Sequence, residues 1–125
     1  MLNMVFVFLH INRPERATRP KEIIIERLQF DKNQIIQYEN LVQKHHKLVL
    51  ENEEQINKLK NNLYQQLNNP NESLKVDSIA QNIAELEKRA ELINYKHFQD
   101  IKKICKHKQL PLFENLVKDL GQLFL

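Results

Sequence analysis

Two histidines are the residues of this chain whose spacing could support chemistry. His45 and His97 lie in two long stretches of regularly spaced apolar residues, on either side of a turn-forming segment around Pro70. If each stretch is a helix and the chain reverses direction near Pro70, the two imidazoles meet at the same level between the helices. Neutral imidazole is a good ligand for zinc, nickel, cobalt and copper. The pair therefore predicts a divalent transition-metal site, which a carboxylate, a methionine or water would complete.

The neighbouring histidine adds a third candidate ligand. His46 lies about 100° round a helix from His45, so the two cannot share one position facing the partner helix. We include His46 as a metal ligand from an oblique face, with a plain surface position as the alternative. His45 and His97 also have an alternative interpretation, because histidines between helices occur as ordinary hydrogen-bonded core residues. Both interpretations stay open at the level of the sequence.

The remaining sequence contains no recognisable catalytic site, and we predict that the protein is not an enzyme. It has no nucleophile paired with a base and no paired-carboxylate site, and a single glycine excludes most phosphate-binding loops. The lone Cys105 rules out an intrachain disulfide and a multi-cysteine metal site. The net charge of +3 is too small to indicate a nucleic-acid partner, so none is expected.

The apolar spacing predicts two long helices. With only 1 glycine and 4 prolines, the chain must form long uninterrupted elements. Asp31 and Gln34 can form a capping box at the start of the first helix. Positions separated alternately by three and four residues then make a heptad seam: Ile35, Tyr38, Val42, His45, Val49, Asn52, Ile56, Leu59, Leu63 and Leu67. After a turn at residues 68–73, the seam resumes at Val76, Ile79, Ile83, Leu86, Ala90, Ile93, His97, Ile101 and Ile104.

Shorter helices are expected on both sides of this pair. One runs from Lys21 to about Gln29 with Pro20 in its first turn. After a break at residues 106–108, a final amphipathic helix has Pro111 in its first turn and presents Leu112, Phe113, Leu116, Val117, Leu120 and Phe124. The predicted fold is all-α, an elongated antiparallel helical hairpin with short N-terminal and C-terminal helices. Apolar residues off the seam would stay exposed in a single chain, which predicts a dimer: Leu41, Leu48, Leu92 and Phe98.

The first residues have a different composition from the rest. Residues 1–12 are almost wholly apolar up to Ile11, and we interpret them as the end of a truncated hydrophobic anchor, with an N-terminal strand as the alternative. Residues 13–20 are expected to be a linker, and residues 21–125 a helical sensor-like or chaperone-like domain. The cluster of basic residues after the apolar run favours a cytoplasmic flank by the positive-inside rule. A cytoplasmic coiled-coil interaction protein therefore stays open as a third hypothesis.

Two short segments carry a resemblance to a known family. Phe30-Asp31-Lys32-Asn33-Gln34 is similar to the first Leu-Thr-x-x-Gln motif of the Spy/CpxP and CnrX group of periplasmic proteins. Cys105-Lys106-His107-Lys108-Gln109, followed by Phe113, is similar to a degenerate second copy, with Lys106 in place of the capping threonine. The segment from His97 to Cys105 also resembles the pattern before that motif in the metal-sensor branch. The resemblance extends from about Pro20 to Phe124.

The resemblance implies both a fold and a function. Members of this group are four-helix hairpin proteins, commonly dimers, and include stress chaperones and membrane-anchored heavy-metal sensors. It therefore implies a periplasmic domain, anchored to the inner membrane, that binds a divalent metal and a signalling partner. The alternative is a metal-independent stress chaperone or adaptor that binds unfolded clients. Histidines with carboxylate or methionine support are the ligands of the sensor branch, and His45, His46 and His97 match them in kind.

Overall fold

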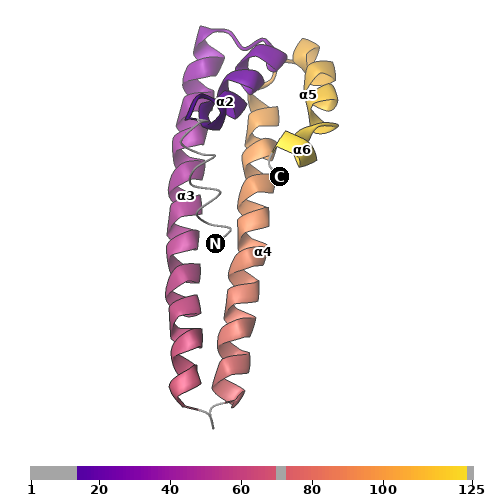
Figure 1. The fold of residues 1–125 in the computed structure, drawn as a ribbon. Helices are drawn as coiled ribbons and strands as arrows, with labels where there is room; N and C mark the ends of the chain where they lie inside the picture. Colours follow the sequence, from indigo (N-terminus) through magenta and orange to yellow (C-terminus); the bar gives the residue numbers. More distant parts are fainter. Residues whose placement is uncertain (1–13, 70–72, 124–125) are drawn as a thin grey trace. The chain divides into compact units, whose positions relative to one another are not determined.

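The computed structural model describes residues 14–69 and 73–123, and these residues are almost entirely helical, with no strand among them. Figure 1 shows two long helices, α3 (Lys32–Gln65) and α4 (Ser73–Ile104), together with shorter helical segments. The all-α prediction is confirmed. The proposed anchor at residues 1–12 lies outside the described residues.

The chain divides into two compact units, which we describe separately. The terminal unit contains the residues up to Tyr38 and those from Lys102 onward. The helix-pair unit consists of Glu39–Ile101, which includes most of α3, the short 3₁₀ segment η1 (Gln66–Asn68) and most of α4. The capping motifs therefore belong to the first unit and the candidate metal ligands to the second.

The terminal unit has a small apolar core. It is built from α2 (Pro14–Leu28), the start of α3, the end of α4, η2 (His107–Gln109), α5 (Leu110–Val117) and α6 (Leu120–Leu123). Helix α2 packs against α5, and an ion pair of 2.8 Å joins Arg27 to Asp119. The buried apolar side chains come from α2, from the start of α3 with the connection before it, and from α5: Ile24, Leu28, Phe30, Tyr38, Phe113 and Leu116. The Phe30 and Tyr38 rings meet edge to face, with centroids 5.8 Å apart.

Helix α2 differs from its predicted start. It begins at Pro14 rather than Lys21, so residues 14–20 of the expected linker are helical. Pro14 can occupy a first helical turn, since the missing amide would have no partner there. The helix ends with a Schellman motif, in which the amides of Gln29 and Phe30 donate to the carbonyls of Glu26 and Ile25. Gln29 takes the left-handed conformation, with φ 55°, that glycine usually supplies.

The other helix boundaries agree with the sequence more closely. The chain breaks after Ile104, and Pro111 lies in the first turn of α5, as predicted. The final helix is shorter than expected because α5 ends at Val117, and the separate short helix α6 follows. Of its predicted apolar face, Phe113 and Leu116 are buried, whereas Val117 is exposed.

The helix-pair unit has a thin interior. Along the predicted seam only Asn52, Ile56, Ile79 and Ile101 are buried in this unit, and Val42, His45, Val49, Ile93 and His97 are only half-buried. Two helices packed on each other cannot enclose both sides of the seam between them. Apolar side chains such as Leu50 and Leu92 are accordingly more than half exposed.

Candidate functional site

The His45 and His97 rings lie in direct contact within the helix-pair unit. Their centroids are 4.2 Å apart and their planes differ by 17°, so the rings are stacked. The predicted contact between these two rings is therefore present. His46 is exposed and is not part of this stack. Of the three predicted metal ligands, the structure brings together two.

A third polar side chain fixes the His45 ring. The Nε2 atom of His45 lies 2.7 Å from Oδ1 of Asn94. An amide oxygen can only accept a hydrogen bond, so Nε2 carries the proton and Nδ1 keeps a free lone pair. Asn94 was not among the site residues predicted from the sequence. Its position three residues before His97, on the same helical face, is the signal that would have found it.

The environment keeps His97 neutral. Burial, and to a smaller extent the charge of the adjacent His45, lowers the pKa of His97 to about 4, while Asp100 opposes the shift. A neutral imidazole is the form that binds metal. At pH 7 the His97 ring therefore need not release a proton before it can bind a metal.

The stacked geometry limits how these rings could share a metal ion. A metal lies in the plane of an imidazole ring, about 2.0–2.1 Å from an unprotonated nitrogen. Two nearly parallel rings do not direct their lone pairs at one point, so one ring must rotate before both can bind the same ion. No cluster of three or more histidine, cysteine, aspartate or glutamate side chains suited to a metal occurs in residues 14–69 and 73–123. Water would complete the coordination.

The histidine stack borders an open groove of about 200 Å³ between α3 and α4. Its apolar side chains are Leu41, Leu48, Leu92 and Ile93. Charged residues of the groove are Lys44, Arg89, Lys96 and Asp100, of which Lys96 and Asp100 form an ion pair of 2.8 Å. We call this the leucine groove. A ligand placed here would contact both the histidines and the cations.

A second groove, of about 400 Å³, is polar. The buried Asn52 contributes to its lining and donates from Nδ2 to the carbonyl of Leu86, at 2.9 Å. The Oδ1 atom of Asn52 is buried without a hydrogen-bond partner. An unpaired buried amide oxygen is costly, so the Oδ1 atom offsets part of what the hydrogen bond to Leu86 contributes to stability.

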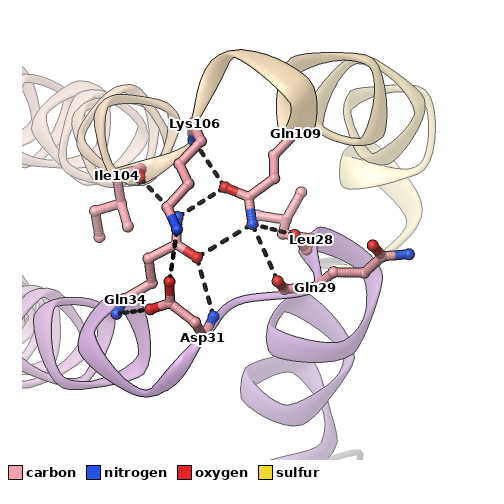
Figure 2. Close-up of polar contacts among 7 residues, drawn as sticks. All are labelled: Leu28, Gln29, Asp31, Gln34, Ile104, Lys106 and Gln109. Atoms are coloured by element: carbon pink, nitrogen blue, oxygen red, sulfur yellow. Dashed lines mark hydrogen bonds and ion pairs between the residues drawn. The ribbon is translucent and has the colours of Figure 1, made fainter.

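The two resembled motifs meet in the terminal unit (Figure 2). Gln34 completes its capping box as predicted, because its backbone amide donates to Asp31 Oδ1 and its Oε1 accepts from the Asp31 amide. Gln34 Nε2 also donates to Gln109 Oε1 at 2.7 Å and to the carbonyl of Ile104. In return, Gln109 Nε2 lies 3.1 Å from Gln34 Oε1. The two glutamines thus bind each other directly.

Gln109 also binds the end of α2 and the residue that precedes η2. Its Nε2 lies 3.0 Å from the carbonyls of both Leu28 and Gln29, at the end of α2. Its Oε1 accepts from the backbone amide of Lys106, at 2.7 Å. We call Gln34, Gln109 and these partners the glutamine junction. Both glutamine side chains are almost fully buried.

Lys106 plays a different part from the threonine of the resembled motif. A lysine ammonium has no acceptor, so it cannot cap the following amides, and only the Gln109 half of a capping box can form. Its Nζ atom instead contacts Asp31 Oδ2 at 2.8 Å. This contact holds the pKa of the Asp31 carboxyl below its usual value. Lys106 therefore links the two motifs instead of capping the helix that follows it.

Comparison with protein-family models, with curated proteins and with solved structures found no match to this chain. None of the described helices is both long enough and apolar enough to cross a membrane.

Proposed function

We propose that the protein is a periplasmic heavy-metal sensor or resistance-type domain, in which His45 and His97 bind a divalent metal and a partner protein receives the signal. The observation that carries the proposal is the direct contact of the two imidazoles, 4.2 Å apart between α3 and α4. Zinc, nickel, cobalt and copper are the metals that suit imidazole ligands. Metal binding would require one ring to turn, which couples binding to the packing of the helix pair.

Two features of the pair support a ligand role. Ligating histidines commonly donate their other ring proton to a carbonyl group, which fixes the tautomer and the ring orientation. The bond from His45 Nε2 to Asn94 Oδ1 has this form and leaves Nδ1 for the metal. The lowered pKa of His97, about 4, keeps its ring unprotonated at neutral pH. His46 is exposed and would join only from outside the stack.

The wider assignment rests on the resemblance to the Spy/CpxP and CnrX group. It includes a four-helix hairpin arrangement, a dimer, and an inner-membrane anchor in residues 1–12. The mutual bonds of Gln34 and Gln109 support it, because they join the two segments that resemble the family motifs. Exposed apolar side chains of the helix-pair unit outside the leucine groove, such as Leu50 and Tyr64, support a dimer, since a second chain would cover them.

Calorimetric titration with zinc, nickel or cobalt tests the metal site. We expect His45→Ala and His97→Ala each to weaken binding strongly, because either change leaves a single imidazole. Asn94→Ala should weaken binding about tenfold or more through loss of the supporting hydrogen bond. His107→Ala is the matched control, because this exposed histidine lies in η2 of the terminal unit. Equal binding by the wild type and the His45→Ala, His97→Ala double variant would refute the proposal.

A metal-independent stress chaperone or adaptor is the second candidate. Large exposed apolar side chains in the helix-pair unit favour it: Leu50, Tyr64, Leu67, Leu74, Val76, Leu92 and Tyr95. Such residues can contact unfolded clients without any cofactor. The purified protein should then suppress aggregation of an unfolding client in the presence of a chelator. Absence of suppression at stoichiometric excess would count against this function.

A further inference from the structure

The leucine groove has a repeat along its length. Leu41 and Leu48 lie on α3 seven residues apart, and both line the groove. Seven residues of α-helix rise about 10.5 Å, which brings side chains nearly back to the same face. The apolar part of the groove therefore follows the helix axis for about two turns. On the α4 side Leu92, which is 57% exposed, completes it.

The cations along the groove have the same period. Arg89 and Lys96 are also seven residues apart, on α4, and Lys44 lies opposite on α3 between the two leucines in sequence. Lys96 is paired with Asp100, but Lys44 and Arg89 form no ion pair within the described residues. All three cations are exposed. The groove thus combines apolar side chains with exposed cations from both helices.

This pattern matches the surface of one kind of partner. A helix with apolar side chains at heptad spacing would place successive residues at the levels of Leu41 and Leu48. Acidic residues on its flanks would then face Lys44 on one side and Arg89 on the other. In an extended peptide every second side chain points to the same face, at intervals of about 6.6 Å. This interval does not match the spacing of about 10.5 Å between residues seven apart on each helix of the groove.

We propose that the leucine groove is the docking surface for an acidic amphipathic helix of another protein, which binds as a third helix against α3 and α4. The helix buries leucine-like side chains against the groove centre and pairs its carboxylates with Lys44 and Arg89. Helix-in-groove binding of this kind is a common mode of peptide recognition. The inference concerns the groove alone and does not depend on metal binding.

Two designed peptides test the proposal. Each is a labelled helix of about three heptads with leucine at the a and d positions, and carries either glutamate or lysine at e and g. Binding to the whole protein is measured by fluorescence anisotropy in chelator-containing buffer, so that failure of the metal site cannot affect the result. We expect the glutamate peptide to bind, with an affinity that falls as salt increases, and the lysine peptide to bind far more weakly.

Charge reversal in the groove distinguishes docking from general attraction to a basic protein. Lys44→Glu with Arg89→Glu should weaken the glutamate peptide about tenfold or more and strengthen the lysine peptide. Lys58→Glu with Lys75→Glu makes the same change in net charge at exposed positions that do not line the groove, and should alter neither affinity appreciably.

Two results would overturn the proposal. One is similar binding of both peptides, or an equal loss of affinity for the glutamate peptide in the groove and control variants. Either outcome would mean that the peptides do not recognise the charges of the groove itself. The other is failure of the glutamate peptide to bind while the groove variant converts a dimer to a monomer in sedimentation. That result would assign the groove to a second copy of this chain.

Discussion

The terminal unit and the helix-pair unit use buried polar groups in opposite ways. In the terminal unit, Gln34 and Gln109 are almost fully buried, and each amide is engaged with several partners. In the helix-pair unit, Asn52 is equally buried but leaves its oxygen unpaired, and the two histidines stack on each other. A network in which every buried polar group is hydrogen-bonded stiffens its surroundings. A network with an unpaired group lowers stability instead, and it can be kept for another function.

The two units also differ in how far their apolar side chains are exposed to solvent. The terminal unit surrounds its network with a small core of aromatic and aliphatic side chains, while the seam of the helix pair stays half-open to solvent. Binding surfaces are commonly drawn from such less stable regions. We therefore expect polar substitutions to reduce stability most at the glutamine junction, and substitutions in the helix pair to act mainly on binding.

The largest expected effect is that of Gln109→Ala. It removes the partner of the Leu28 and Gln29 carbonyls, of the Lys106 amide and of the Gln34 side chain. Because these groups lie in a buried site, we expect the free energy of unfolding to fall by about 3 kcal/mol. Urea denaturation followed by circular dichroism measures this change.

An exposed glutamine provides the control for that experiment. Gln37→Ala, on the exposed face of α3, should change the free energy of unfolding by less than about 0.5 kcal/mol. If Gln109→Ala costs no more than Gln37→Ala, water replaces the missing amide and the junction does not stabilise the unit.

The histidine stack predicts a loss of stability in acid. The folded pKa of His97 is about 4, below the unfolded value near 6.5, so the unfolded chain binds a proton more readily between these values. Stability therefore falls as pH drops from 6.5 to 4 in the metal-free protein. After allowance for the partial exposure of the ring, we expect a loss of about 1–2 kcal/mol.

Comparison of two variants isolates the contribution of His97. His97→Leu should flatten this part of the pH profile of unfolding, whereas His107→Leu, at an exposed position, should leave it unchanged. A profile that is the same in all three proteins would mean that His97 titrates alike in the folded and unfolded chains.

Local and periodic features of this fold were predictable from the sequence. The capping box of Asp31 and Gln34 involves residues three apart, so it can be recognised from one short segment of sequence. The contact of His45 with His97 could be predicted from the seam spacing together with an expected chain reversal near Pro70, because that reversal fixes which residues of the two helices face each other.

Contacts between distant segments were not predictable in the same way. The bonds of Gln109 to Gln34 and to the end of α2 depend on how several elements pack, which no local spacing encodes. The start of α2 was misjudged because Pro20 favoured a first turn, although Pro14 satisfies the same rule earlier in the chain. The Asn94 bond to His45 was not predicted, because an amide side chain is not a usual ligand of the metals that imidazole binds.

A smaller effect is expected when the unsatisfied asparagine is replaced. Asn52→Leu removes one buried hydrogen bond to the Leu86 carbonyl, and it also removes the unpaired Oδ1 atom. Apolar replacement of an incompletely bonded group is often favourable. We therefore expect the free energy of unfolding to rise by about 1 kcal/mol, as measured by thermal denaturation. Asn61→Leu, at an exposed position of α3, should give no comparable gain. A loss of stability in Asn52→Leu would mean that the Leu86 bond outweighs the unpaired oxygen.

The smallest expected effect concerns backbone strain beside the glutamine junction. Gln29 has φ 55°, a conformation in which a side chain is disfavoured, and its own side chain is exposed. Gln29→Gly should raise the free energy of unfolding by about 0.5 kcal/mol, because glycine relieves the strain but gives the unfolded chain more freedom. The Gln29 carbonyl would still accept from Gln109, so the junction stays intact. Gln37→Gly, within α3, should instead lower the free energy of unfolding by about 1 kcal/mol. If both glycine variants are less stable than the wild type, the left-handed conformation of Gln29 stores no strain that glycine can relieve.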